Sequence, residues 1–265
     1  MIEISGTQTP VDTTTWSPLA AAIYARKWSS RKVYRYSSVS QLRFEMEART
    51  SIVAAAEEIS GSGIRFADFR TARCNERFWT RTPQGGFRIR EDVPPSAGIR
   101  DIFSSGWSYA TECSTATSIV VYKGVLDVLG DPAFNRLFAG LLLYNWHVDS
   151  DLRLTAHQGN GESYPGDLMY VNNPDFNPET PQWRGENLVK IGDEFYYGHP
   201  VGIVPLRMVI DGLNGVRRPG SLVSAYLTDE VVEPDYRYLS QFAPGMRRNV
   251  SAHIGGRRYG DPPLL

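Results

Sequence analysis

The order of helical and strand-like segments along these 265 residues is the feature that most restricts the folds open to the chain. Two patterns with the helical period of about 3.6 residues occupy 39–60 and 111–129. Short runs rich in β-branched and aromatic residues, bounded by Pro, Gly and Asn, follow in the second half. Because these strands come after the helices instead of alternating with them, the sequence predicts an α+β fold and not a repeated βαβ arrangement.

Local end signals support the two long predicted helices. Ser38 and Gln41 have the S-x-x-Q spacing of a capping box, and Gly61 follows the end of the first helix. Gly130 ends the second helix. We expect two shorter helices, at 97–103 and 207–213.

Strand patterns and turn residues complete the predicted elements. Short strands or turns are expected at 66–69 and 77–80, strands at 141–148, 167–171, 186–191 and 195–204, and a short strand or helix at 223–227. Hairpin turns are expected at 84–86 and at Gly192-Asp193. The sheet is therefore expected to be mostly antiparallel.

The chain divides into three parts by composition. Residues 1–37 are rich in Thr, Ser and Pro with little periodicity, which predicts an extended N-terminal lead-in. Residues 38–228 hold the predicted helices and strands and form the expected main domain. Residues 229–265 are rich in Pro, Gly and Arg and are expected to form a tail with little structure of its own.

Composition excludes several classes of function. The 28 Lys and Arg residues against 29 Asp and Glu leave a net charge of −1, so no long-range field attracts nucleic acid or an anionic membrane. The apolar runs are far shorter than the ~20 residues of a membrane span, and the N-terminus lacks a secretory signal pattern. Two cysteines, Cys74 and Cys113, form no disulfide framework, so a reducing, cytoplasmic location is predicted.

Lysine is scarce among the basic residues. Of the 28, only four are lysines: Lys27, Lys32, Lys123 and Lys190. A GC-rich genome is the first explanation, and a surface kept poor in primary amines is the second.

Motif absences narrow the chemistry. The chain has no phosphate-binding loop, no dinucleotide fingerprint and no G-x-S-x-G nucleophile turn. It has no C-x-x-C, H-E-x-x-H or EF-hand pattern, and its four histidines are scattered, so no metal or other cofactor is predicted. Thiol chemistry remains as the best-supported enzymatic option.

Cys113 is the candidate nucleophile because it falls in the first turn of the second predicted helix. Free backbone amides and the helix dipole would lower its pKa from ~8.5 and could bind the oxyanion of an acyl intermediate. The alternative is that Cys113 is a small buried apolar residue. Cys74 has no comparable setting.

A thiol nucleophile needs a base, and three residues are candidates. His199 and His147 are favoured by the ordinary pKa of imidazole, ~6.5. Glu186 follows Trp183 closely, and burial against an indole would raise a carboxyl pKa into a useful range. Its alternative is a solvated carboxylate at a strand end.

Several strings occur together and in order. They are Ile52-Val53-Ala54-Ala55-Ala56, Pro94-Pro95-Ser96, Ile99-Arg100-Asp101-Ile102, Glu112-Cys113, Thr115-Ala116, Tyr144-x-Trp146-His147, Gly166-Asp167-x-x-Tyr170, Asn173-Pro174-x-Phe176 and Gln182-Trp183-Arg184-Gly185-Glu186-Asn187. With these strings the sequence resembles the compact bacterial transglutaminases, the protein-glutamine γ-glutamyltransferases first associated with spore coats of bacilli. The resemblance runs from about 38 to 227.

The resemblance implies a calcium-independent enzyme with a papain-like core, in which the nucleophile at a helix N-terminus packs on the sheet. By position it makes Cys113 the nucleophile, Glu186 the principal acid and base, and Glu112 a substitute base. It places an aromatic substrate passage at Trp146, Trp183, Tyr170 and Phe66, with His199 close to the centre. Asn145, Thr111 and Pro200 depart from the residues usual in the family, at positions that affect the rim and the support of His199.

The implied reaction joins protein glutamine and lysine side chains by ε-(γ-glutamyl)lysine bonds through a Cys113 thioester, with release of ammonia. The partners are then proteins that carry those side chains, including coat proteins, and a spore-coat location is implied if the host sporulates. One alternative is a cysteine hydrolase, either a protein deamidase or a cell-wall amidase. Another is a catalytically silent coat or structural protein.

Overall fold

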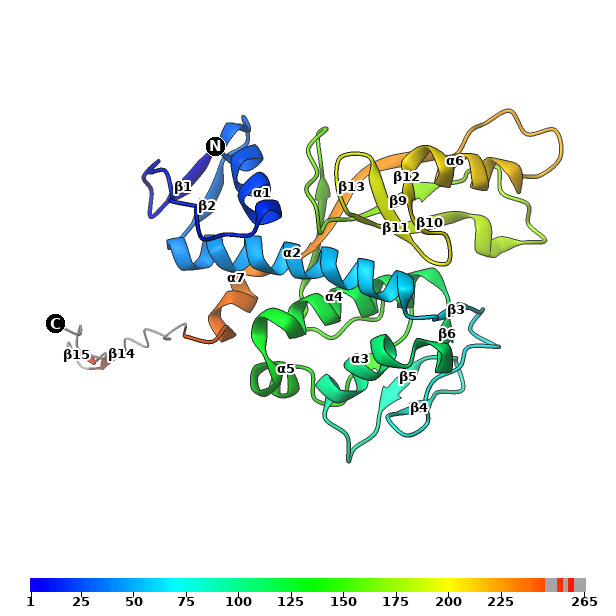
Figure 1. Cartoon of the computed structure of the whole chain (residues 1–265), viewed down its shortest axis with the longest axis horizontal. Helices are drawn as coiled ribbons and strands as arrows, with labels where there is room; N and C mark the ends of the chain where they lie inside the picture. Colours follow the sequence, from blue (N-terminus) through cyan, green and yellow to red (C-terminus); the bar gives the residue numbers. More distant parts are fainter. Residues whose placement is uncertain (246–251, 255–256, 260–265) are drawn as a thin grey trace.

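A six-stranded antiparallel sheet and a long helix that crosses beside it organise the molecule (Figure 1). The computed structural model describes residues 1–245, 252–254 and 257–259. The helices are α1 (Pro18–Ser29), α2 (Val39–Gly61), α3 (Pro95–Ser104), α4 (Cys113–Leu129), α5 (Asp131–Leu137), α6 (Leu206–Gly215) and α7 (Tyr236–Leu239), with 3-10 turns at Gly106–Ser108, Pro181–Trp183 and Ser240–Phe242. The strands are β1 (Ile2–Ile4), β2 (Tyr34–Tyr36), β3 (Arg65–Phe66), β4 (Trp79–Arg81), β5 (Phe87–Ile89), β6 (Ala110–Thr111), β7 (Leu142–Leu143), β8 (Leu154–Gln158), β9 (Leu168–Asn172), β10 (Gly185–Lys190), β11 (Phe195–Gly198), β12 (Gly202–Pro205), β13 (Tyr226–Pro234), β14 (Ala252–Ile254) and β15 (Arg257–Tyr259).

The main sheet has the strand order β12-β11-β10-β9-β13-β8. Each pair of neighbours in it is antiparallel. The last strand in sequence, β13, lies between β9 and β8, with a register shift between Leu227 and Val231. The predicted α+β class and the mostly antiparallel sheet are therefore confirmed.

Helices α2 and α4 pack closely and carry the largest core cluster. Gly124 of α4 faces Ile52 of α2, and a Cβ at Gly124 would lie 2.5 Å from Ile52 Cγ1. Only glycine permits that approach. In Figure 1, α2 runs between the sheet on one side and α3, α4 and α5 on the other. Cys113 thus begins a helix whose far side is fully buried, and this fixes the position of the thiol.

The N-terminal segment is folded, so the expected extended lead-in is wrong for residues 18–29. Ser17 caps α1 by accepting a hydrogen bond from the Ala20 amide, and Pro18 stands in the first turn. The alanines that follow have high helix propensity but give little apolar periodicity, which is why the pattern did not reveal the helix. Strands β1 and β2 pair in parallel beside α1 and share with it a second apolar cluster.

The expected unstructured tail is wrong for its first part. Residues 229–234 belong to β13, and residues 236–239 form α7. Asp229 and Glu230 interrupt the apolar alternation of β13, so its pattern is weak although it pairs on both edges. The predicted tail beyond residue 245 lies outside the described residues except for β14 and β15.

Most of the other predicted elements are present with shifted ends. The predicted strand at 141–148 shortens to β7, because Asn145 has a φ of 52° and the His147 amide donates to the Tyr144 carbonyl in a turn. The predicted strand at 195–204 is the hairpin of β11 and β12. The turns expected at 84–86 and Gly192-Asp193 connect β4 to β5 and β10 to β11.

A buried charge cluster joins the N-terminal segment to the body of the protein. We use this name for Lys27, Glu45, Arg49, Asp167 and Glu233. Arg49 Nε lies 2.8 Å from Glu45 Oε1, its Nη1 lies 2.5 Å from Asp167 Oδ1, and its second amine pairs with Glu233.

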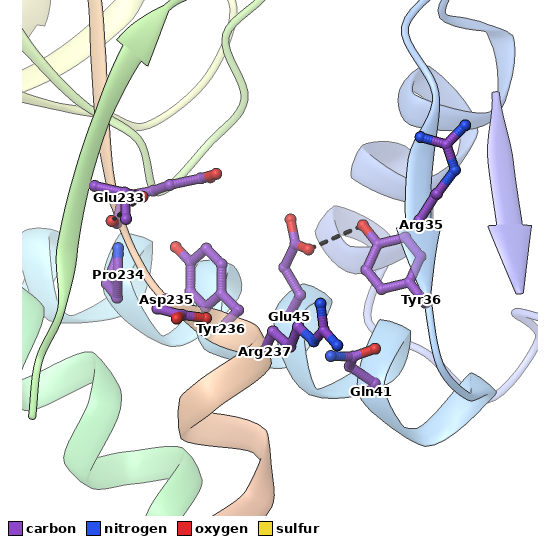
Figure 2. A pocket seen from close by; sticks show the side chains of 10 residues that line it. Arg35, Tyr36, Gln41, Glu45, Glu233, Pro234, Asp235, Tyr236 and Arg237 are labelled. Carbon is purple, nitrogen blue, oxygen red and sulfur yellow. Dashed lines mark hydrogen bonds between the residues drawn. The ribbon is translucent and has the colours of Figure 1, made fainter. Parts of the chain in front are cut away.

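Figure 2 shows Glu45 of the charge cluster beside a cavity of about 220 Å³, with its carboxylate accepting a hydrogen bond of 2.9 Å from Tyr36. Burial by itself would raise the pKa of Glu45, but Lys27 and Arg49 lower it to about 2. The cluster is therefore a structural link between α1, α2 and β13 in which Glu45 is ionised.

Candidate active site

A cavity of about 1300 Å³ opens at the N-terminus of α4. Cys113, Phe66, Trp146 and Tyr170 all line it, together with Asn187. These residues come from five separate segments of the sequence, so the fold itself assembles the site. The structure thus brings the predicted nucleophile together with three of the four predicted aromatic residues.

Glu112 caps the helix that carries the nucleophile. Its carboxylate accepts hydrogen bonds from the amides of Ser114 at 2.6 Å and Thr115 at 2.8 Å. A carboxylate at this position stabilises the helix N-terminus. Two of the amides that the sequence assigned to oxyanion binding are therefore occupied by Glu112.

The thiol of Cys113 is a weak acid in this setting, so the expected lowering of its pKa is wrong. Burial raises its pKa, and the charges of Glu186 and Glu112 raise it further, to about 12. The main physical cause is burial of the thiol, to which the negative charges of Glu186 and Glu112 add, and Glu112 also occupies two of the helix amides. Asn187 opposes this shift: its Nδ2 lies 3.3 Å from Cys113 Sγ and donates to it.

Glu186 lies on β10 with 3% of its surface exposed. Burial raises its pKa, the backbone amide of His199 lowers it, and Glu112 raises it, with a result of about 8. The His199 amide donates to Glu186 Oε1 at 3.0 Å and fixes the carboxyl group in place. A carboxyl that exchanges its proton near neutral pH has the property that a general acid and base requires.

His199 is buried next to Glu186, neither residue lines the cavity, and the ring of His199 is bound to the backbone. Its Nε2 lies 3.2 Å from the Thr111 carbonyl, and the ring stands 6.1 Å from that of Phe66. Burial lowers the pKa of His199, which favours the neutral imidazole. The residue thus supports Glu186 and the wall of the site. His147, the other candidate base, is exposed in the turn after β7.

Trp183 is the one predicted passage residue that does not line the cavity. Its ring stacks on Phe66, with centroids 6.0 Å apart and planes inclined by 11°. It therefore supports the wall from behind. Cys74 is buried near Trp79, and burial raises its pKa to about 11, as expected for an inert thiol.

The loop that carries Trp146 is tied to the start of α4. Asn145 accepts a hydrogen bond of 2.8 Å from the Ser114 hydroxyl, and its amide donates to Thr115 Oγ1 at 2.8 Å. Trp146 remains 39% exposed at the rim of the cavity. Asn145, a departure from the family pattern, thus links the rim to the segment that holds the nucleophile.

Asn187 is a site residue that sequence reasoning missed. It follows Glu186 on β10 and pairs across the sheet with Tyr170, so both face the cavity. Its position at the end of the string 182–187 was the one sequence feature that could have pointed to it. A single asparagine in a strand has no sequence pattern that identifies it as the partner of a thiol. Its contact with Cys113 depends on how α4 meets the sheet.

The described residues show neither a metal site nor a membrane-spanning helix. Within the described ranges, no group of three or more His, Cys, Asp or Glu side chains is arranged to hold a metal ion. In the same part of the chain, no helix combines the length and the apolar character needed to cross a membrane. Calcium independence remains a prediction.

Comparisons with known proteins agree with this geometry. Residues 1–243 match the family described as protein-glutamine gamma-glutamyltransferase. The chain is 41% identical over 237 residues to the protein of that name from Bacillus cereus (strain B4264), covering 88% of this chain and 86% of that one. A protein of the same name from Bacillus mycoides (strain KBAB4) is 41% identical over 238 residues, with 89% and 86% covered.

A solved structure is also similar to this one. It is a transglutaminase from Geobacillus stearothermophilus without its C-terminal extension, 47% identical, with a TM-score of 0.75. The match covers 78% of this chain and 98% of that one. The family match begins before residue 38 and ends after residue 227, so the limits expected for the resemblance were too narrow. The chain belongs to the protein-glutamine gamma-glutamyltransferases, the transglutaminases.

Proposed function

We propose that this transglutaminase transfers acyl groups through a Cys113 thioester, with Glu186 as the acid and base of both half-reactions. The observation that carries the proposal is the state of Glu186: it is buried, held by the His199 amide at 3.0 Å, and has a pKa of about 8. Membership of the family gives the reaction, which is the exchange of a glutamine γ-carboxamide for an isopeptide bond to a lysine amine.

In the first half-reaction, Glu186 in its ionised form accepts the Cys113 proton. The thiolate attacks the γ-carbonyl carbon of a glutamine, and its C–N bond breaks as Glu186 returns the proton to the departing ammonia. Asn187 donates to the sulfur at 3.3 Å and stabilises the thiolate before attack.

In the second half-reaction, a lysine amine attacks the thioester. The amine has an ordinary pKa of ~10.4, so it arrives protonated and must lose a proton in the site. The ammonium loses one proton through Glu186 to solvent before it attacks; its second proton passes through Glu186 to the sulfur as the C–S bond breaks, which restores the Cys113 thiol and leaves Glu186 ionised. Water competes for the same thioester, so the rings of Phe66, Trp146 and Tyr170 around the cavity favour amine transfer by limiting its access.

Glu112 serves chiefly as the cap of α4 in this proposal. Both oxygens of its carboxylate are engaged by the amides of Ser114 and Thr115. It can replace Glu186 as a base only by releasing an amide, so its contribution to transfer is secondary. His199 acts as a positioning residue through its backbone amide.

The proposed substrates are proteins of a coat or envelope, and the proposed location is cytoplasmic with transfer to the spore coat in a sporulating host. The resemblance to coat-associated enzymes supports this. In such a host, replacing the gene by its Cys113→Ser variant is expected to raise the fraction of coat protein that detergent extracts. An unchanged extract would contradict the coat assignment and leave the enzymatic one intact.

The decisive test is incorporation of a fluorescent primary amine into casein by the purified protein, with EDTA present. We expect label that depends on Cys113 and is absent with Cys113→Ser. Ammonia release without label would identify a hydrolase that passes the acyl group to water. No label and no ammonia would favour the catalytically silent structural protein.

A further inference from the structure

The lysines of a transglutaminase are possible acceptors in the reaction that the enzyme catalyses, and this chain has four lysines. All four lie in the part of the chain that the structure describes, so the surroundings of each amine are known. Three are withheld from an incoming thioester, and one is not.

Lys27 and Lys190 are buried. Lys27 is 2% exposed and its amine pairs with Glu45 inside the charge cluster. Lys190 is 6% exposed, and its amine donates to the Ser163 hydroxyl at 2.7 Å. Neither amine can reach a carbonyl carbon in another protein without local unfolding.

Lys123 is held by charge on the flank of α4. Its side chain is 12% exposed, and its amine lies 2.7 Å from Asp127 and 3.2 Å from Glu58. An amine that is paired with two carboxylates and largely covered is poorly placed to attack a thioester of another molecule.

Lys32 differs from the other three lysines chiefly in its exposure. It is exposed and belongs to the four-residue connection 30–33 between α1 and β2. Its amine lies 5.5 Å from the centroid of the Tyr34 ring, and its charge helps to lower the pKa of Glu162 without a direct ion pair of the kind that holds Lys123. A lysine in an exposed connection can be drawn into the active site of another molecule as an extended segment.

Lys32 lies far from the Cys113 of its own chain. The 23-residue helix α2 begins next to β2 and ends next to β3, which borders the active site. A helix of that length spans about 35 Å. Figure 1 shows β2 and β3 near its opposite ends. Transfer to Lys32 must therefore come from a second copy of the enzyme.

We propose that Lys32 is the acyl-acceptor site through which one copy of this enzyme is modified by another. The proposal rests on the proposed function, since it needs the Cys113 thioester. The Lys32 amine of one copy attacks the thioester carbon on the other, the C–S bond breaks, and an amide bond forms. The proton lost from the amine restores the Cys113 thiol by way of Glu186. Where the acyl group comes from a glutamine of the enzyme itself, the product is a covalent oligomer.

The test separates catalyst from acceptor. The catalyst is the Lys32→Arg variant, and the acceptor is the Cys113→Ser variant, which has an accessible Lys32 but forms no thioester. The probe is a biotinylated peptide carrying the benzyloxycarbonyl-Gln-Gly donor sequence. We expect one biotin per acceptor chain, located at Lys32 by peptide mass spectrometry, and little on the catalyst.

Two matched acceptors give the comparison. Adding Lys32→Arg to the Cys113→Ser acceptor is expected to lower biotin incorporation at least tenfold, whereas adding Lys123→Arg is expected to leave it unchanged. Label that survives Lys32→Arg, or an unlabelled Cys113→Ser acceptor beside normally labelled casein, would overturn the proposal. If the catalyst leaves casein unlabelled too, the proposed function fails instead.

Discussion

Two buried carboxyl groups in this molecule have similar exposure, but their pKa values are shifted in opposite directions. Glu45 in the charge cluster is 7% exposed, and Glu186 beside the nucleophile is 3% exposed. Burial raises the pKa of both, but Lys27 and Arg49 reverse the effect at Glu45 and bring its pKa to about 2. At Glu186 the effect of burial prevails over the His199 amide, Glu112 adds a smaller increase, and the pKa rises to about 8. At similar depths of burial, the neighbouring cations Lys27 and Arg49 make Glu45 a structural carboxylate, whereas burial dominates at Glu186 and makes it an exchangeable one.

The two carboxyls contribute to stability in opposite pH ranges. The folded-state pKa of Glu45 lies below its unfolded value, so its contribution is present above about pH 4 and is lost as the pH falls toward 2. The folded-state pKa of Glu186 lies above its unfolded value, so its contribution is present below about pH 4 and is lost as the pH rises through 8. The active site is therefore most costly to fold where it is most reactive.

The largest expected effect is on catalysis. Replacing Glu186 by Gln removes the proton acceptor and is expected to lower amine incorporation by about 10²–10⁴-fold. Because Gln cannot ionise, the same variant is expected to have a higher Tm than the parent at pH 9. Full transfer by Glu186→Gln, together with loss of transfer in His199→Ala, would assign the base to the histidine instead.

The next effect is on folding. Replacing Arg49 by Met leaves Glu45, Asp167 and Glu233 without their shared cation and is expected to cost about 3–5 kcal/mol in urea unfolding. Arg43→Met is the matched control, because Arg43 pairs with Glu47 on the same helix with both side chains 51% exposed. That control is expected to change stability by less than about 0.5 kcal/mol. Equal losses of unfolding free energy in the two variants would show that the buried ion pairs of Arg49 stabilise the fold no more than the exposed pair of Arg43.

The pH dependence of transfer sharpens the comparison. Transfer requires Glu186 ionised and Cys113 protonated, or the equivalent form with the proton exchanged, so kcat/KM is expected to rise through about pH 8. The variant Glu186→Gln should lose this rise from its residual activity. A profile already flat between pH 6 and 9 would contradict the assigned proton affinity.

The smallest effect concerns Asn187. Replacing it by Ala removes the donor to Cys113 Sγ and is expected to slow transfer by about tenfold, the value of one hydrogen bond to a charged group. The same change should raise the thiol pKa, measured as an upward shift in the pH profile of alkylation by iodoacetamide. Slower transfer with an unshifted alkylation profile would mean that Asn187 only shapes the cavity.

Capping residues and helix-ending glycines predicted the two long helices, because these features depend on residues close together in the sequence. The capping box at Ser38 and the glycine stop gave α2 nearly to the residue, and Cys113 was placed in the first turn of α4. The α+β class followed from the order of these elements. The string 182–187 identified Glu186, and the structure places it on a buried strand as a carboxyl of raised pKa.

Features that depend on distant residues escaped prediction. The cap made by Glu112 competes with oxyanion binding for the same amides, and that choice depends on the folded backbone. The strand β13 carries charged residues whose pairing partners lie about 60 to 80 positions away. Asn187 gained its role only from the meeting of α4 with β10. Sequence periodicity carries no information on such contacts.

The place of β13 in the sheet sets the order in which the enzyme matures. Strands β8 and β9 meet only through β13, which leaves the ribosome after both of them. Glu230 and Val232 of β13, with Leu154 and Ala156 of β8, form one wall of the cavity above Cys113. A nascent chain that stops before residue 226 has the thiol but not this wall. The cavity is thus completed only after residues 226–234 have been synthesised and have paired with β8 and β9.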